Sequence, residues 1–470
     1  MEWAIMPHAS ELMSEWKTVS AALGSLLLPM LPGLAAAWAF QVYRPWFWAE
    51  FLLLALAARG RPLCFAAGLA LLWLADFLFA FAQVNLSSNY GDVLELLGFL
   101  PYANIGWILA GIVGLVVLVA WGWLCVRVHR MGSPGRSMLV WVLVITSVAV
   151  AVPRLDGFNH TESKLYGIRH AKLAGSWVLD SHFMRQAMAF YEEGYAPDVG
   201  VFRPIEPKQS AVSRLGDLSQ GTAMPDKLLL IVVESWGLAH DEVENQFWRD
   251  LWRVPSLRQL DTGTVHSQGS TLQGELRELC GLIPQTLRID DVPQAENCLP
   301  NRLRAQGWQT RAFNGASPRM YRNGNWYPQI GFAQRSFLPE LIADGRLCSN
   351  MPGVCDYSIA DRVIQTLHEP GRQFSYWMTL NSHTPYKLGD LSSPDVPDRV
   401  CPVLQLEGAR CAHAALLYDF MQSLKGALLR HPLPGLRIVL VGDHQPKFFD
   451  ADSRDAFVEG QVPYLVLEVD

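Results

Sequence analysis

Long apolar runs fill the first third of the chain, at 20–42, 46–58, 62–84, 104–126 and 137–153. A helix needs roughly 17–25 apolar residues to cross the hydrocarbon core of a bilayer, and four of these runs are long enough. The run at 46–58 is shorter and is compatible with an interfacial or re-entrant segment. Tryptophan and tyrosine residues lie near the ends of the runs, as in the aromatic belts of membrane proteins. We therefore predict that residues 1–153 form a multi-span α-helical membrane domain.

The distribution of arginines predicts on which side of the membrane the rest of the chain lies. The link between the second and third runs carries Arg59 and Arg61, and the link after the fourth run carries three arginines. The link at 85–104 contains no Lys or Arg. Because basic links of membrane proteins stay on the cytoplasmic side, the fifth run should exit outward. The C-terminal part is therefore expected to be extracytoplasmic.

Composition agrees with a membrane protein and argues against a nucleic-acid partner. Apolar residues make up 50% of the 470 residues and charged residues only 17%, which is unusual for a wholly soluble protein. The net charge is −6, and no stretch is strongly basic. A nucleic-acid-binding protein would need a basic surface, so we expect no such partner.

Six cysteines follow residue 226, in three short intervals: 280/298, 348/355 and 401/411. An even set in an extracytoplasmic domain indicates disulfides, and the sequential pairing is the preferred one of the fifteen that six cysteines allow. Free buried thiols are the alternative. A zinc cluster is disfavoured because no CxxC spacing occurs.

Residues 154–225 are predicted to be a linker with helices that lie either on the membrane surface or on the following domain. From residue 226 to 470 the pattern changes to short Val/Ile/Leu-rich strands that alternate with helical segments. This pattern predicts an α/β domain, with a largely parallel sheet covered by helices on both faces. Ligands of such folds bind at the carboxyl ends of the strands.

Two of the predicted strands end on side chains that bind metals, and a third segment offers a hydroxyl. Glu234 follows LLLIVV, Asp443 and His444 follow RIVLVG, and Thr271 lies in GSTLQGEL. A carboxylate at the end of a buried strand must be paired or bind a metal, although a structural ion pair would explain Glu234 equally well. Together the four side chains suit one divalent metal beside a nucleophilic alcohol.

The order of five motifs resembles a known family. The motifs are ESWG, GSTLQGEL with Glu275, FNGASPRMYRNGNWYPQIGF, TLNSHTPY and VGDHQPKF. In this order and spacing the chain is similar to the membrane-anchored phospho-alcohol transferases of the alkaline phosphatase superfamily. These include lipoteichoic acid synthases, related phosphoglycerol transferases and phosphoethanolamine transferases.

The resemblance implies a role for each site residue. Thr271 would be the nucleophile, Glu234, Thr271, Asp443 and His444 would ligate one Zn or Mn ion, and His383 would contact the phosphate or protonate the leaving alcohol. The segment 313–332 would line the substrate pocket with these side chains: Asn314, Tyr321, Arg322 and Asn323. Three of the four depart from lipoteichoic acid synthases, in which His, Trp and Arg are usual at 314, 321 and 323. Arg322 or Arg319 would then supply a cation to the phosphate.

The resemblance also implies a reaction and a location. A phosphoethanolamine or phosphoglycerol head group would pass from a phospholipid donor, through Thr271, to a hydroxyl of a glycan or lipid acceptor in the cell envelope. The protein would be a multi-pass protein of the bacterial inner membrane, with its catalytic domain in the periplasm. The alternatives are a phosphodiesterase or sulfatase-like hydrolase and an inactive membrane scaffold. A sulfatase would need a C/S-x-P-x-R signature, which the neighbourhood of Thr271 lacks.

Overall fold

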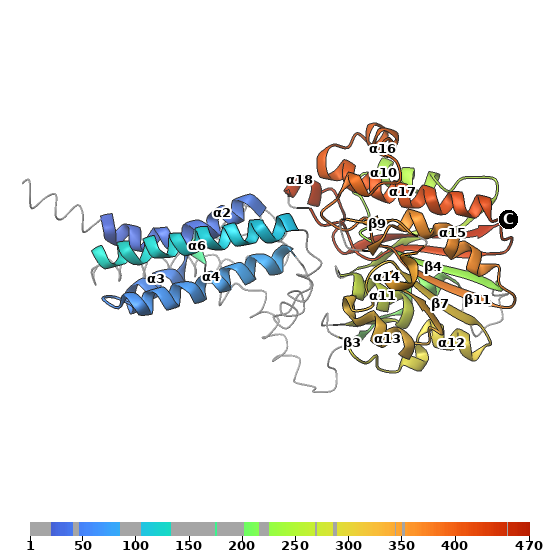
Figure 1. Ribbon diagram of the computed structural model, residues 1–470, viewed down its shortest axis with the longest axis horizontal. Coiled ribbons are helices and arrows are strands. Elements are labelled where there is room, and N and C mark those ends of the chain that lie inside the picture. The colour runs from blue at the N-terminus through green and yellow to red at the C-terminus, as the bar shows by residue number, and fades with distance from the viewer. Residues whose placement is uncertain are drawn as a thin grey trace, which may run out of the picture. The chain divides into compact units, whose positions relative to one another are not determined.

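The computed structural model describes residues 20–40, 47–84, 105–132, 174–175, 202–215, 225–267, 270–284, 289–343, 345–349, 353–448 and 450–470. The chain forms two compact units, Met1–Asn85 with Ile105–Tyr195 and Leu86–Asn104 with Ala196–Asp470 (Figure 1). The predicted span at 137–153 and most of the predicted linker at 154–225 lie outside the described residues.

The first unit is helical where it is described. Its elements are η1 (Leu28–Met30), α2 (Leu31–Phe40), α3 (Ala49–Ala57), α4 (Pro62–Val84) and α6 (Ile105–Met131), with the short strands β1 (Phe47–Trp48) and β2 (Ala174–Gly175). Among the described residues, the stretches Ser20–Ala37 and Ile108–Met131 are long and apolar enough to cross a bilayer. The predicted five-span membrane domain is therefore not confirmed.

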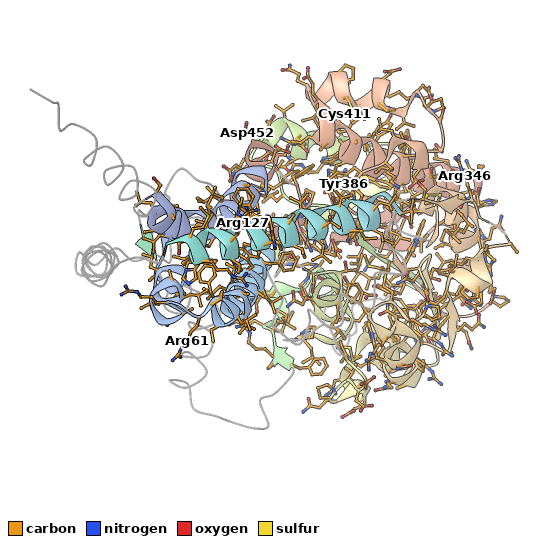
Figure 2. The ribbon with its side chains drawn as sticks, turned by 60° about the vertical axis from the view of Figure 1, so that its left-hand side comes forward. Arg61, Arg127, Arg346, Tyr386, Cys411 and Asp452 are labelled. Atoms are coloured by element: carbon orange, nitrogen blue, oxygen red, sulfur yellow. A yellow bond between two sulfur atoms is a disulfide. The ribbon has the colours of Figure 1, made fainter. Side chains whose placement is uncertain are left out.

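One end of this helical unit gathers arginines. His129, in the last turn of α6, lies 3.2 Å from the carbonyl oxygen of Ala58, which closes α3. This contact places Arg127 near the turn that carries Arg61 (Figure 2). The described arginines of the two links, Arg61 and Arg127 among them, thus lie toward the same end of the described helices.

The second unit contains a seven-stranded sheet in the order β5-β13-β12-β4-β11-β7-β8. The strands are β4 (Lys227–Val233), β5 (Leu257–His266), β7 (Gln309–Asn314), β8 (Gln334–Ser336), β11 (Gln373–Met378), β12 (Arg437–Gly442) and β13 (Gln461–Val469). The pairs from β12 to β8 are parallel, whereas β13 is antiparallel to both β12 and β5. The prediction of a largely parallel sheet is confirmed.

Helices cover both faces of the sheet because the central strands are apolar on both sides (Figure 1). Leu229, Ile231 and Val233 of β4 pack in one cluster with α10 (Glu242–Asp250), α15 (Asp356–Leu367), α16 (Val396–Leu404) and α17 (Gly408–Arg430). The alternate residues of β4 pack with α11 (Thr271–Cys280), α12 (Leu299–Ala305) and α13 (Asn323–Gln329) on the other face.

Short elements complete this unit. They are β3 (Phe202–Pro204), β6 (Leu282–Pro284), β9 (Leu347–Cys348), β10 (Gly353–Val354), α14 (Leu338–Leu341), α18 (Ala451–Arg454), η4 (Pro207–Gln209), η5 (Ala211–Leu215), η6 (Ala295–Asn297), η7 (Met320–Arg322) and η8 (Leu388–Asp390). The disulfides are Cys280–Cys298, Cys348–Cys355 and Cys401–Cys411, which confirms the sequential pairing.

Candidate active site

Strand register brings the predicted metal ligands together. Gly442 at the end of β12 is the partner of Val233 at the end of β4, so Asp443 and Glu234 emerge side by side from parallel strands. The Asp443 amide donates to the Val233 carbonyl, at 3.1 Å, and continues the ladder by one bond. Both carboxylates therefore lie at the carboxyl edge of the sheet, where the sequence predicts a site.

The four predicted ligands converge within hydrogen-bonding distances. Thr271 Oγ1 lies 3.1 Å from Glu234 Oε2 and 3.5 Å from His444 Nε2. The same imidazole nitrogen lies 3.5 Å from Glu234 Oε1 and 3.3 Å from Asp443 Oδ2. All four side chains are buried. The structure thus brings residues 234, 271, 443 and 444 together, as the sequence predicts.

Neighbouring groups hold these side chains in place. Ser235 adopts a left-handed backbone conformation, with φ 55°, and this turn directs its amide to Asp443 Oδ1 at 2.7 Å. Its hydroxyl donates to Glu234 Oε1 at 2.8 Å. Strained backbone of this kind persists where the surroundings enforce it, often at functional sites. His444 Nδ1 lies 2.8 Å from the Gln445 carbonyl, which fixes the ring so that Nε2 faces the carboxylates.

Helix α11 begins at Thr271 and is fixed against the strand that carries Asp443. Ser270 caps the helix by accepting from the Gln273 amide, at 3.4 Å. A Cβ on Gly274 would lie 2.7 Å from the Asp443 Cα atom, so glycine allows the close approach. The buried Arg277 guanidinium donates to the carbonyl oxygens of Gly442, at 2.7 Å, and of Asp443, at 3.3 Å.

Burial shapes the electrostatics of the cluster. Burial, together with the Asp443 carboxylate, raises the pKa of Glu234 well above its ordinary value. Burial lowers the pKa of His444, so its imidazole is neutral at neutral pH. A neutral imidazole with its Nδ1 engaged presents a lone pair on Nε2, the form in which histidine binds metals.

The donor set fits one divalent cation. Asp443 Oδ2 is fully buried and accepts no hydrogen bond, which leaves a carboxylate oxygen for an ion. Four-coordinate ligands with bonds of about 2.0–2.2 Å lie about 3.4 Å apart. The separations given above, 3.1–3.5 Å, are close to that value. Oxygen and imidazole donors suit Zn²⁺ and Mn²⁺ alike.

A pocket beside Thr271 contains most of the predicted substrate-binding residues. Its lining includes Asn314, Tyr321, Asn323 and His383, together with Glu275 and Thr271. Tyr321 hydrogen-bonds to the Thr271 side chain. Burial lowers the pKa of His383 to about 3, so a neutral ring faces the pocket. This favours a contact to substrate over proton donation to the leaving alcohol.

Arg322 does not line this pocket, although the sequence predicts a role for it there. Tyr321 and Arg322 both have left-handed backbone, with φ 46° and 55°, and the turn sends the two side chains in different directions. Arg322 forms an ion pair with Asp290, at 2.6 Å. Arg319 is exposed. Neither arginine is among the described residues that line this pocket, so their predicted contact to a phosphate stays a prediction.

Lys447 is a site residue that the sequence reasoning missed. It interacts electrostatically with Glu234 and Asp443, and burial lowers its pKa. Tyr386 holds its backbone by donating to the Lys447 carbonyl, at 2.9 Å. The signal was its place in VGDHQPKF, three residues after His444.

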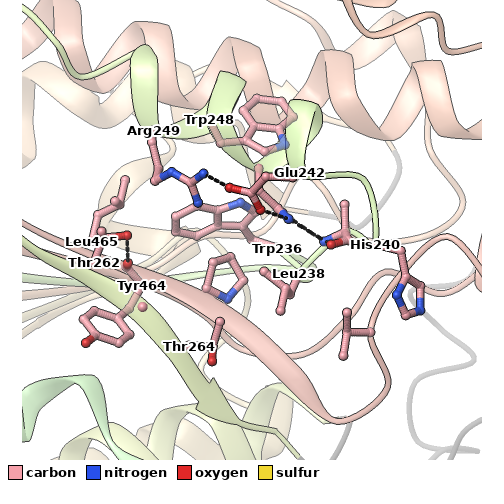
Figure 3. Close-up of a pocket in the computed structure, with 15 residues that line it drawn as sticks. Trp236, Leu238, His240, Glu242, Trp248, Arg249, Thr262, Thr264, Tyr464 and Leu465 are labelled. Atoms are coloured by element: carbon pink, nitrogen blue, oxygen red, sulfur yellow. Dashed lines mark hydrogen bonds and ion pairs between the residues drawn. The ribbon is translucent and has the colours of Figure 1, made fainter.

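A larger cavity of ≈ 370 Å³ lies below α10, next to the edge strand β5 (Figure 3). Trp236 and Trp248 form part of its wall, and Thr262 and Thr264 lie on its floor. None of the four converging residues is among the described residues that line it, so the chemistry is assigned to the smaller pocket.

Comparisons with known proteins bear on the same region. Residues 228–402 match the Sulfatase family model. No curated protein matches the chain at a significant level.

Similar solved structures include a protein in the alkaline phosphatase superfamily from Vibrio parahaemolyticus, with 17% identity and a TM-score of 0.38, covering 52% of this chain and 60% of that one. Another is the lipoteichoic acid synthase LtaP from Listeria monocytogenes, with 12% identity and a TM-score of 0.37. That match covers 51% of this chain and 64% of LtaP. A third is the C-terminal periplasmic domain of EcEptC from Escherichia coli in complex with Zn, with 13% identity and a TM-score of 0.37. That match covers 52% of this chain and 73% of the EcEptC domain. The match thus spans less than two thirds of the first two of these chains.

The matched segment is a little over a third of the chain and contains Glu234, Thr271 and His383, while Asp443 and His444 follow it. Residues 228–402 are therefore identified as a domain of the sulfatase family.

Proposed function

We propose that this chain is a metal-dependent transferase that moves a phosphoethanolamine or phosphoglycerol head group from a phospholipid to an envelope glycan or lipid. The observation that carries the proposal is the position of Thr271. Its hydroxyl lies 3.1 Å from one carboxylate of the cluster and 3.5 Å from the imidazole, at the first turn of α11. Amide groups at the start of a helix favour a phosphate beside that hydroxyl.

Glu234, Thr271, Asp443 and His444 would hold one Zn or Mn ion. When bound, such an ion stabilises the threonine alkoxide and charge on the phosphoryl oxygens. Lys447 would add a positive charge near the cluster, since it interacts electrostatically with Glu234 and Asp443. Lys447 would supply the cation to the phosphate that was expected of Arg322 or Arg319.

In the first step the Thr271 oxygen forms a bond to phosphorus, and the bond between phosphorus and the diacylglycerol oxygen breaks. Glu234 Oε2 already accepts the hydrogen bond of the Thr271 hydroxyl and would take its proton. The proton finally resides on the released diacylglycerol. The product is a threonine phosphodiester that carries the head group.

In the second step an acceptor hydroxyl attacks the same phosphorus atom, and the bond to Thr271 breaks. The acceptor proton is transferred to the threonine oxygen, which restores the enzyme. His383, whose low pKa keeps the ring neutral, would contact the phosphoryl group and not carry the proton. Asn314 and Tyr321 would orient the substrate in the pocket.

Features of the helical unit support a membrane location. Apolar side chains along α6 are largely exposed, among them Val113, Val116 and Val119 at 62–66%. Exposed apolar surface on this scale is typical of lipid contact. With the arginines of the basic links at the cytoplasmic end, the catalytic domain would face the periplasm of a bacterial inner membrane.

The test is peptide mass spectrometry of the full chain, purified in detergent with Zn or Mn and incubated with phospholipid. We expect a head-group adduct on Thr271, no adduct in Thr271→Ala, and a slower reaction in Thr271→Ser, which keeps the hydroxyl. Diacylglycerol release that needs a glycan acceptor would mark a transferase, whereas release into water alone would mark a hydrolase. Full activity of Thr271→Ala would exclude this nucleophile.

A further inference from the structure

The lining of the Thr271 pocket includes buried hydrogen-bond acceptors. Glu275 lies one helical turn after Thr271 on α11 and lines the same pocket. Its side chain is 0% exposed, so the carboxylate is a costly group that the fold retains. The steps described above make no use of it.

The hydrogen bonds of Glu275 leave one of its oxygens with spare capacity. Oε1 accepts from the hydroxyls of Tyr327 and of Tyr376, the latter at 2.9 Å. Oε2 accepts only a long bond from Asn323 Nδ2, at 3.5 Å, among the described residues. A carboxylate offers about four acceptor positions, so Oε2 can take a further donor.

Asn323 adds an independent sign of a missing donor. The residue is 1% exposed and lines the pocket, and its Oδ1 atom is buried without a hydrogen-bond partner. A buried acceptor without a donor is rare in folded proteins and indicates a ligand or an ordered water. A ligand that satisfied both Asn323 Oδ1 and Glu275 Oε2 would carry N–H or O–H groups.

The charge of the pocket lining indicates whether the ligand donates from a charged N–H group or from a neutral O–H group. The described side chains that line the pocket include no Lys or Arg, and the only histidine among them, His383, is neutral. Nothing in this lining balances a negative charge on Glu275. Met320, Met378 and Leu380 add apolar wall beside the carboxylate, suited to methylene groups.

We propose that Glu275 and Asn323 form an ammonium-binding subsite, which selects an aminoalkyl phosphate such as phosphoethanolamine over the neutral polyol of phosphoglycerol. A primary ammonium brings three donors and no acceptor, and its charge matches the carboxylate. The proposal rests on the proposed head-group transfer and specifies the donor lipid.

The protonation state of Glu275 agrees with this assignment. Burial raises the pKa of Glu275 to about 7, so the carboxylate is only partly ionised without a ligand. A bound ammonium would favour the ionised form. The preference for an amine-bearing head group should therefore weaken as the pH falls below 7.

The experiment is a competition between donors. The metal-loaded full chain is given equal amounts of phosphatidylethanolamine and phosphatidylglycerol in mixed micelles, and the two adducts on Thr271 are quantified by mass spectrometry. In the wild type the phosphoethanolamine adduct should dominate. Glu275→Gln should lower the ratio of the two adducts roughly 10- to 100-fold, the effect of one charged hydrogen bond, while the phosphoglycerol adduct persists.

A matched control is Glu244→Gln, another buried glutamate, which lies on α10 across the sheet and pairs with Arg410. This variant should keep the wild-type ratio. A wild type that prefers phosphatidylglycerol, or an unchanged ratio in Glu275→Gln, would overturn the subsite while leaving the transferase intact. The absence of both adducts from the wild type would instead overturn the transferase itself.

A binding measurement covers the case in which Glu275→Gln no longer turns over. Calorimetric titration of metal-loaded Thr271→Ala with ethanolamine phosphate and with glycerol phosphate compares the two head groups without catalysis. Ethanolamine phosphate should bind more tightly, and adding Glu275→Gln should remove the difference. Equal affinities in the Thr271→Ala protein would contradict the proposal.

Discussion

Single buried carboxylates make up much of the candidate active site. Glu234, Asp443 and Glu275 are each exposed by 2% or less at one edge of the sheet. Carboxylates in such surroundings are unfavourable unless hydrogen bonds or cations compensate them. The Ser235 and His444 amides satisfy Asp443 Oδ1, but its Oδ2 atom is left for an ion. Stability and function are therefore coupled at these residues.

The pH dependence of stability should report on Glu275. Its pKa is about 7 in the folded chain and near 4.5 in the unfolded chain. Between these two pH values Glu275 is more protonated in the folded chain than in the unfolded chain. The contribution of Glu275 to the free energy of unfolding therefore falls as the pH rises from 4.5 to 7. The loss should approach about 3 kcal/mol at pH 8. Urea unfolding with chelator present should show this fall in the wild type relative to Glu275→Gln; parallel pH profiles would contradict it.

The convergence of Glu234, Thr271, Asp443 and His444 could be predicted from the sequence. The ends of the apolar strands and the order of the motifs indicate which residues lie at the same edge of the sheet. The roles of Arg322 and Lys447 could not be predicted. Two successive left-handed residues, Tyr321 and Arg322, turn the arginine away from the pocket, and sequence patterns do not specify such a turn at non-glycine residues. Lys447 is three residues from His444, so its approach to the site depends on the path of an irregular loop.

Helix α11 is the element that unites the site. It presents Thr271 at its start, approaches Asp443 through Gly274, and donates from Arg277 to the end of β12. Arg277 also pairs with Glu278, which accepts from the Ser210 hydroxyl at 2.7 Å. Arg277 thus positions the Thr271 hydroxyl relative to the proposed metal ligands, and it is not among the described residues that line the pocket.

Arg277→Lys should weaken metal binding without removing any ligand. Lysine lacks the fork that reaches both carbonyls, so α11 loses its fixed position against β12. Loss of such supporting contacts typically lowers metal affinity 10- to 100-fold. Competition with a fluorescent chelator measures this change, and the exposed Arg302→Lys on α12 is the matched control. Equal affinity in the two variants would show that Arg277 has no positioning role.

At the level of elements, the apolar runs at β4, β11 and β12 predict buried parallel strands because they are continuous and separated by helices. The direction of β13 was not predictable. An apolar run specifies burial but not orientation, and YLVLEV pairs antiparallel with β12. The short η7 and α13 segments were also missed, since they are defined by turns rather than by periodicity.

The whole molecule combines a helical unit with an α/β unit, and the two differ in surface chemistry. Exposed valines and leucines cover α6, whereas in the second unit large apolar side chains are mostly buried in two clusters. Three disulfides, all in the second unit, agree with an oxidising compartment. The composition of each unit is thus suited to a different solvent.

The most direct test of the account is the metal content of the full chain, measured by mass spectrometry after dialysis against Zn or Mn. One ion per chain is expected in the wild type. Glu234→Gln, Asp443→Asn and His444→Ala should each lose most of it, while Glu244→Gln should retain it. A wild type that binds no ion, or variants that keep the full amount, would contradict the claim that these residues form a metal centre beside Thr271.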